Sequence, residues 1–182
     1  MRTLSCLLLL TLFFPSPARA DEFKIEPGFT SFFNGKDLFG WKLRKGGASL
    51  DGKSETAKKR FQVSGGKLII DGKSRGNMVI DTAKQFGKDV HIKFEFLAGK
   101  GCNNDLSFRG LKFDIKKGGV KNLKVGEWQT FEIIVKGKQA EFKCDGELQR
   151  AQKTKSAKSS LGIRAEFGAI QYRRMRYKEP SS

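Results

Sequence analysis

The sequence predicts an all-β protein in which two antiparallel sheets form a sandwich or a barrel. Three observations indicate this fold class. Apolar and polar residues alternate in many short segments, which is the pattern of strands with one buried and one solvated face. Turn signals separate these segments about every 8 to 12 residues. After residue 21 no segment has the period of an amphipathic helix, although residues 82–87 have room for one helical turn.

The first twenty residues are predicted to be a secretory signal peptide and not part of this fold. Arg2 supplies a positive start, residues 4–14 form an apolar run, and Ala18 and Ala20 form a small-residue cleavage pattern. The run is too short for a membrane span, which needs ~20 residues. We therefore expect an exported protein, periplasmic or secreted, with no membrane span and with residues 21–182 in a single β-sandwich domain.

The first half of this domain contains four predicted strands. Residues 61–63 and 67–70 flank a Ser-Gly-Gly turn and therefore predict a hairpin. Residues 78–80 form a short buried run. The clearest alternation is in residues 90–97, where four apolar residues share one face. The polar residues on the opposite face are His91, Lys93 and Glu95.

The second half of the domain continues the same pattern. Asp145 and Gly146 form a strong signal for a type I′ hairpin turn. Residues 51–60 and 149–159 are polar and rich in lysine, so we expect both to be loops. The predicted strands are residues 105–109, 111–115, 130–136, 139–144, 161–166 and 169–177.

The chain is strongly basic, with 36 Lys and Arg against 19 Asp and Glu and a net charge of +17. Loss of Arg2 and Arg19 with the signal peptide lowers this charge to +15. The basic residues are spread over separate segments and no RNA-binding aromatic signature is present, so we expect no nucleic-acid partner. A solvated basic surface is the simplest interpretation, and an anionic extracellular polymer such as a sulfated polysaccharide is the functional alternative.

Two cysteines remain after Cys6 leaves with the signal peptide. Cys102 and Cys144 are an even pair in an oxidising compartment, so a disulfide and two buried free thiols both stay open. The chain has a single histidine, His91, and these three residues have no recognisable zinc-ligand spacing. We therefore expect neither a metal nor a cofactor.

Six groups of motifs occur in the same order as in a known family. Residues 28–41 read GFTSFFNGKDLFGW, and the later motifs are FQV with GKL, FEF, NNDLSFRG, GEWQ and GIRAEFGAIQYR. Together they resemble DUF1080, the 3-keto-disaccharide hydrolase domain family of exported bacterial proteins. The resemblance covers nearly all of residues 28–179. It implies a concanavalin A-like jelly-roll β-sandwich and hydrolysis of 3-keto-disaccharides or related 3-keto-glycosides, with a carbohydrate as the partner.

The chain also departs from the family pattern at several positions. Lys112 stands where the family has a Glu, Asp114 stands where it has a Gln, and Glu166 replaces a His. Asn104 and Asp105 replace the Ser-Gly of the NSG motif. If the family chemistry uses that Glu, this chain is an altered or inactive member. The alternative function is therefore a non-catalytic carbohydrate-binding module for extracellular glycans, including anionic ones.

The implied substrate has an acidified hydrogen at carbon 2 because carbon 3 is a ketone. Cleavage by elimination needs a base for this hydrogen, a cation for the developing enolate and an acid for the leaving oxygen. Strand parity allows several polar residues to point away from the core, so we expect one polar sheet face to form the site, and these residues are Glu95, Ser107, Arg109, Asp114, Arg164 and Glu166. We interpret Arg109 as the enolate clamp, Glu95 and Asp114 as candidate bases, and Glu166 as the candidate acid. The candidate substrate-binding residues are Ser107, Lys112, Arg164 and Trp128.

These residues also have ordinary structural interpretations. Glu95 and Arg109 are equally well explained as a cross-strand ion pair on a wet face, which contributes under ~1 kcal/mol. Trp41 and Trp128 lie at strand starts, where burial in the core is commoner than contact with a sugar. A bound divalent cation at Asp105 and Asp114 is conceivable, but no calcium-loop pattern is present.

Overall fold

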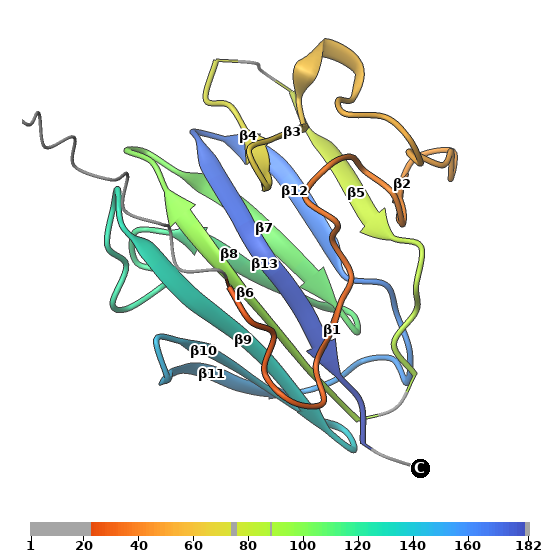
Figure 1. Ribbon diagram of the computed structural model, residues 1–182. Coiled ribbons are helices and arrows are strands. Elements are labelled where there is room, and N and C mark those ends of the chain that lie inside the picture. The colour runs from red at the N-terminus through yellow and green to blue at the C-terminus, as the bar shows by residue number, and fades with distance from the viewer. Residues whose placement is uncertain (1–22, 74–75, 88, 181–182) are drawn as a thin grey trace, which may run out of the picture.

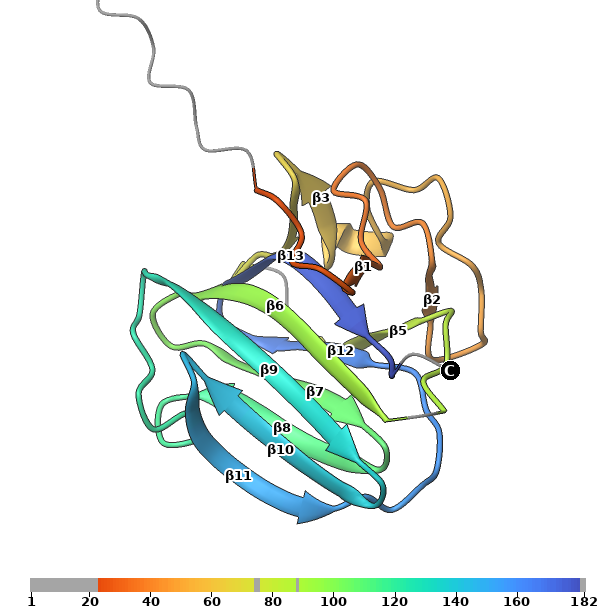
Figure 2. The same cartoon turned by 60° about the horizontal axis from the view of Figure 1, so that its bottom comes forward.

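A computed structural model describes residues 23–73, 76–87 and 89–180, which form two antiparallel sheets stacked face to face (Figures 1 and 2). The predicted signal peptide, residues 1–20, lies outside the described residues. Within them, no helix is long and apolar enough to cross a membrane. The predicted all-β sandwich is confirmed.

The larger sheet has eight strands in the order β11-β10-β9-β6-β13-β4-β3, and β1 pairs with β13. Every pairing in it is antiparallel. Its strands are β1 (Thr30–Ser31), β3 (Gln62–Ser64), β4 (Lys67–Ile70), β6 (Val90–Ala98), β9 (Trp128–Lys136), β10 (Gln139–Cys144), β11 (Glu147–Lys153) and β13 (Ile170–Lys178).

The smaller sheet has five strands in the order β2-β5-β12-β7-β8. It covers the inner face of the larger sheet, so each sheet has one face in the core and one face toward solvent (Figure 2). Its strands are β2 (Trp41–Leu43), β5 (Met78–Thr82), β7 (Asn103–Phe108), β8 (Leu111–Lys116) and β12 (Gly162–Phe167).

Phenylalanine rings from both sheets fill the centre of the sandwich. Phe131 of β9 is fully buried, and its ring centroid lies 5.5 Å from that of Phe94 in β6 and 4.9 Å from that of Phe113 in β8. Phe113 in turn stacks on Phe142 of β10 at 5.0 Å. Trp41 is also fully buried, which confirms its core interpretation. Nine of the 16 phenylalanines are buried in this core.

Two local expectations were wrong. Residues 82–87 form no helical turn, because Thr82 ends β5 and its hydroxyl donates to the Lys84 carbonyl, while Phe86 pairs with Ser159 in an isolated bridge. Residues 147–153 form the edge strand β11, although most of this segment was expected to be a loop. The polar loop at residues 51–60 does hold one short 3₁₀ turn, η1 (Ala57–Lys59).

The opening motif is explained by a tight turn. The Asn34 side-chain oxygen accepts the backbone N–H groups of Lys36 and Asp37, and the Asp37 carboxylate accepts that of Phe39. Gly35 has a φ of +70°, and a Cβ there would lie 3.1 Å from the Cα of Gly66. The motif therefore has a structural role in joining this turn to the β3–β4 hairpin.

The two cysteines are free thiols on different sheets. Cys102 precedes β7 of the smaller sheet and Cys144 ends β10 of the larger sheet, and both are buried. Burial raises the pKa of the Cys102 thiol. Burial, together with the nearby Asp145 and Glu147, raises the pKa of the Cys144 thiol to about 12. Both thiols therefore stay protonated near neutral pH and behave as small apolar side chains.

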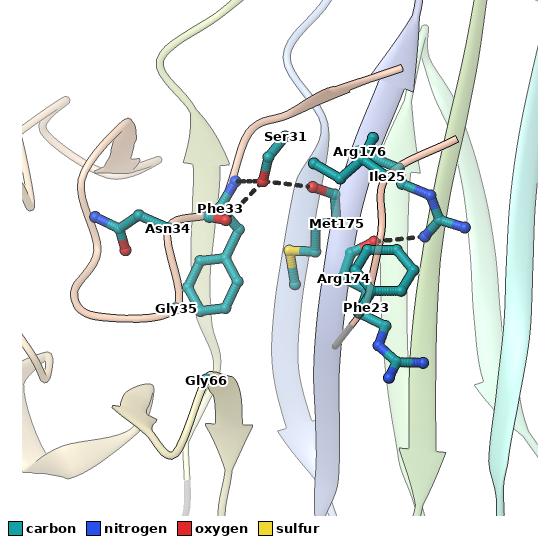
Figure 3. A pocket seen from close by; sticks show the side chains of 10 residues that line it. All are labelled: Phe23, Ile25, Ser31, Phe33, Asn34, Gly35, Gly66, Arg174, Met175 and Arg176. Carbon is teal, nitrogen blue, oxygen red and sulfur yellow. Dashed lines mark hydrogen bonds between the residues drawn. The ribbon is translucent and has the colours of Figure 1, made fainter. Parts of the chain in front are cut away.

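The segment before β1 is fastened to β13 and borders a cavity of about 240 Å³ (Figure 3). The Ser31 hydroxyl lies 2.8 Å from the Phe33 carbonyl oxygen and 3.2 Å from the Met175 carbonyl oxygen. Arg176 of β13 also holds this segment. Its Nε and Nη2 atoms both donate to the Glu26 carboxylate, and the distance from Nη2 to Oε1 is 2.5 Å. Lys93 Nζ lies 3.3 Å from the same carboxylate.

The Glu26 contacts predict a loss of stability at acidic pH. The hydrogen bond from Arg176 is the main cause that lowers the pKa of Glu26 to about 2, below its usual value of 4.5. A lowered carboxyl pKa contributes stability that is complete above pH 4.5 and is lost as the pH falls toward 2. Because Glu26 is partly exposed, we expect this contribution to be only about 1 kcal/mol.

Urea unfolding at pH 6 and at pH 3 measures this effect. Glu26→Gln should lower the free energy of unfolding at pH 6, and it should lower it clearly less at pH 3, where part of the Glu26 contribution is already lost. The exposed Glu127→Gln serves as a control that removes the same charge. An equal loss from Glu26→Gln at both pH values would contradict the assignment.

Candidate functional site

The outer face of the five-stranded sheet gathers charged side chains from adjacent strands. Asp105 on β7 is paired with Arg164 on β12 and with Asp114 on β8. Since neighbouring side chains of a strand point to opposite faces, this register places all three on the solvent face, with Lys112 two residues before Asp114 on the same face. Glu166 follows Arg164 at the same two-residue interval on β12.

These five residues form one connected ionic cluster, which we call the central cluster. Asp105 Oδ2 lies 3.2 Å from Arg164 Nη1 and 3.4 Å from Lys112 Nζ. Lys112 Nζ also lies 2.8 Å from Asp114 Oδ1, and Arg164 Nη2 lies 3.1 Å from Glu166 Oε1. Each cation therefore bridges Asp105 and one outer carboxylate.

Asp105 differs from the two outer carboxylates in its burial. Its side chain is 6% exposed, whereas those of Asp114 and Glu166 are 34% and 28% exposed. Burial raises the pKa of Asp105, and the charges of Lys112 and Arg164 offset part of that effect. Asp105 is thus placed to hold the two cations, while Asp114 and Glu166 are accessible to a molecule on the sheet.

The backbone of Glu166 is held by two buried side chains. The Asn104 side-chain oxygen accepts the Glu166 N–H at 2.8 Å, and Arg60 Nη2 donates to the Glu166 carbonyl at 2.8 Å. Arg60 and Asn104 are both almost fully buried. The Glu166 carboxylate therefore projects from a fixed point, although β12 is irregular between Arg164 and Phe167.

A second group lies beside the central cluster on the same face. Arg44 makes a bidentate contact with Asp81, at 2.6 and 3.0 Å, and its Nη2 lies 2.6 Å from the Ser107 hydroxyl. The guanidinium reaches Ser107 by passing over Gly162. A Cβ on Gly162 would lie 2.6 Å from Asp81 Oδ1 and closer still to Arg44 and Ser107. Glycine at this position is therefore what lets Arg44 cross the strand.

Five of the eight predicted site residues share this face. They are Ser107, Lys112, Asp114, Arg164 and Glu166. The residues that sequence reasoning did not assign to the site are Arg44 and Asp81, and Asp105 was considered only as a cation ligand. Alternation in β5 and β7 places Asp81 and Asp105 on the polar side of their strands. Arg44 follows the short strand β2, for which no alternation can be counted.

Glu95 and Trp128 belong to the other sheet and do not join this site. Glu95 lies on β6, where its carboxylate contacts Arg173 at 2.7 Å and Arg174 at 2.8 Å. The Arg173 guanidinium stacks on the Trp128 ring, 3.9 Å from its centroid. The expectation that Glu95 shares one polar face with Asp114 and Glu166 is therefore corrected, because β6 belongs to one sheet and β8 and β12 belong to the other.

Arg109 does not face Glu95 either, so their expected cross-strand pairing is wrong. Arg109 lies in the β7–β8 turn of the smaller sheet, is 3% exposed and lines a cavity at the end of the sandwich. Its φ of +50° turns the side chain away from the alternation of β7. The cations that do contact the predicted site carboxylates Asp114 and Glu166 are Lys112 and Arg164.

The carboxylates of the central cluster are neutralised by side-chain cations. Within residues 23–73, 76–87 and 89–180, no group of three or more His, Cys, Asp and Glu residues is arranged to hold a metal ion. In the cluster, Lys112 Nζ takes the position between Asp105 and Asp114 where a shared cation was conceivable. The chemistry that the arrangement offers is therefore that of carboxylates beside ammonium and guanidinium groups.

The sequence matches a known family of domains. The profile of a family described as "3-keto-alpha-glucoside-1,2-lyase-like domain" matches residues 28–121. The chain belongs to this family. The match contains Lys112 and Asp114 but ends before Arg164. The sequence has no match among curated proteins.

Solved structures share the fold at low sequence identity. A "putative glycosyl hydrolase" from Parabacteroides distasonis superposes with a TM-score of 0.65 at 17% identity, covering 85% of this chain and 95% of its own. A second such protein from that organism has a TM-score of 0.55 at 13% identity, with 77% and 99% covered. The carbohydrate-binding module CBM66 from Bacillus subtilis has a TM-score of 0.51 at 13% identity, with 78% and 97% covered. These likenesses establish the sandwich fold and no activity.

Proposed function

We propose that this protein cleaves 3-keto-glycosides, including 3-keto-disaccharides, by elimination on the outer face of the five-stranded sheet. The observation that carries the proposal is the central cluster, which places two accessible carboxylates beside two cations in a chain of the 3-keto-glucoside lyase-like family. The predicted signal peptide supports an action outside the cytoplasm, on sugars in the periplasm or medium.

In the proposed reaction the substrate ring lies over Asp105. Lys112 and Arg164 bind the carbon-3 carbonyl oxygen, and they stabilise the enolate that forms when Asp114 takes the carbon-2 proton. The bond between carbon 1 and the glycosidic oxygen then breaks, and a carbon 1–carbon 2 double bond forms. Glu166 gives a proton to the leaving oxygen. Addition of water to the double bond completes a net hydrolysis.

The departures from the family pattern are compatible with this chemistry. A glutamate in place of the family's histidine still supplies an exchangeable proton. A lysine in place of the family's glutamate adds a cation where the enolate charge develops. Asp114, which stands next to it, then supplies the carboxylate. The proposal therefore assigns the reaction to residues that differ in type from those of the family.

The test is an assay of the purified protein with 3-keto-trehalose and a 3-keto-glucoside. We expect release of the free alcohol or sugar together with a 2-hydroxy-3-keto-glycal, detected by chromatography and by the absorbance of its enone. Asp114→Asn and Glu166→Gln should each lower kcat/KM by about 100-fold or more, as expected for loss of a general base or acid. Both side chains are partly exposed, so the fold should persist.

Glu141→Gln is the matched control, because Glu141 is an exposed carboxylate on the other sheet that also pairs with a lysine. Its kcat/KM should equal that of the parent protein. The proposal fails if no 3-keto-glycoside is cleaved. It also fails if the Asp114 and Glu166 variants cleave as fast as this control.

A further inference from the structure

We propose that the cavity beside the β7–β8 turn is a second binding site, specific for an anionic sugar that carries a carboxylate or a sulfate group. The cavity has a volume of about 420 Å³, which is in the range of small-molecule sites. Arg109, Lys138 and Lys155 supply positive charge to its lining, and Thr154 and Ser156 supply hydroxyl groups. None of these residues belongs to the central cluster, so the site is independent of the proposed cleavage reaction.

The cavity is built by loops that are fastened to one another. The backbone N–H of Lys155 donates to the Arg109 carbonyl at 2.9 Å, and that of Thr154 donates to the Lys138 carbonyl at 2.8 Å. The Ser159 hydroxyl accepts the Arg109 N–H at 2.7 Å. These bonds join the β7–β8 turn, the β9–β10 turn and the loop after β11. The lining is therefore formed before any ligand binds, which lowers the entropic cost of binding.

The conformation of Arg109 is the strongest sign that this cavity has a function. Arg109 and Gly110 form a two-residue hairpin turn with φ values of +50° and +73°. Such a turn favours asparagine, aspartate or glycine in its first position, and arginine is poorly suited to it. The guanidinium is in addition almost completely buried. Strained and buried charged residues of this kind gather at functional sites.

Gly110 gives Lys155 room to approach the turn. A Cβ at Gly110 would lie 2.7 Å from the Lys155 Cβ, so a larger residue would push Lys155 away from Arg109. The two cations therefore border the same cavity because of the glycine between them.

The electrostatic balance of the cavity selects an anion. Asp89 is the one acidic residue among the described lining residues, and its carboxylate is bonded to the Gly137 N–H at 2.7 Å. The lining cations Arg109, Lys138 and Lys155 thus outnumber this carboxylate, whose charge offsets part of that of Arg109. A carboxylate or sulfate forms charge-assisted bonds with arginine, and the nearby hydroxyls suit the hydroxyl groups of a sugar ring.

Calorimetric titration of the full protein with glucuronate and with glucose 6-sulfate tests the site. We expect at least one of them to bind, more weakly at high salt, and the preferred probe identifies the anionic group. Arg109→Asn should weaken binding about 10-fold or more. This variant places a residue favoured by the turn, but it also removes a buried guanidinium that contacts the Phe108 ring, so thermal unfolding must show that it is folded. Lys155→Gln should also weaken binding. If Arg109→Asn does not fold, the binding affinity of Lys155→Gln tests the proposal.

Lys100→Asn is the matched control for charge, because Lys100 is exposed in the β6–β7 turn at the opposite end of β6. Its binding should stay within about 2-fold of the parent protein, as expected for an exposed charge outside the site. The proposal is overturned if neither anionic sugar binds or if Arg109→Asn and Lys155→Gln bind like this control. It is also overturned if glucose or inorganic sulfate binds as tightly as the anionic sugars, since the site would then not be specific for a sugar that carries an anionic group.

Discussion

Phe131→Ala should lower the free energy of unfolding by about 3–5 kcal/mol. Phe131 is fully buried at the centre of the sandwich and contacts aromatic rings from both sheets. Removal of its ring opens a cavity between the sheets. The neighbouring rings of Phe94 and Phe113 cannot fill this cavity without giving up their own packing contacts. Domains of this size are commonly stable by only about 5–15 kcal/mol, so this single loss is a large part of the total.

Urea unfolding followed by tryptophan fluorescence measures the change. Phe39→Ala is the matched control, because Phe39 is 62% exposed and the same atoms are removed. The control should change the free energy of unfolding by no more than about 0.5 kcal/mol. Equal effects of the two substitutions would mean that the aromatic cluster does not hold the sheets together.

Alternation along the sequence predicts which side chains are buried. In β6 apolar and polar residues alternate from Val90 to Phe96, and the structure buries every second residue from Val90 to Ala98. The pattern fails at β11, where five of the seven residues are polar and only Gln149 is buried. As the edge of its sheet, β11 needs few apolar residues, and exposed polar side chains guard such an edge against further pairing.

Alternation does not predict which sheet a strand joins. Glu95 and Ser107 both lie on polar strand faces, but β6 pairs with β9 and β13, whereas β7 pairs with β8 and β12. Three of these four partners are far away in the sequence, and the choice depends on the packing of the complete core. Residues assigned to a single polar face from sequence therefore divided between two opposite faces.

Irregular backbone also hides sites from a sequence pattern. A bulge in β13 brings both Arg173 and Arg174 to the carboxylate of Glu95, although adjacent residues of a regular strand point to opposite faces. In the sequence, the alternation of β7 continues through Arg109. In the structure, Arg109 is the first residue of the β7–β8 turn, and its side chain does not lie on the polar face of β7. By contrast, Ser107 and Lys112, which are both candidate substrate-binding residues from the sequence, lie opposite each other across a two-residue hairpin turn.

The second large effect is expected for Asp105→Asn, which should lower kcat/KM for 3-keto-glycosides by about 10- to 100-fold. Asp105 is a positioning residue, because its buried carboxylate holds Lys112 and Arg164 side by side. A neutral amide removes that attraction, and its NH₂ group repels a nearby cation. In this variant Lys112 still contacts Asp114, and Arg164 still contacts Glu166. The free energy of unfolding should therefore fall by only about 1–3 kcal/mol.

Asp81→Asn separates this effect from a general loss of stability. It makes the same chemical change on the same sheet face, where Asp81 pairs with Arg44 outside the proposed reacting groups. Both variants should have a lower free energy of unfolding. Only Asp105→Asn should lower kcat at saturating substrate and change the dependence of kcat on pH. The reason is that this variant releases Lys112 and Arg164, the cations that border both outer carboxylates. Equal kcat losses in the two variants would show that Asp105 acts only through the fold, and the assignment of Lys112 and Arg164 as the enolate-stabilising pair would then have to be abandoned.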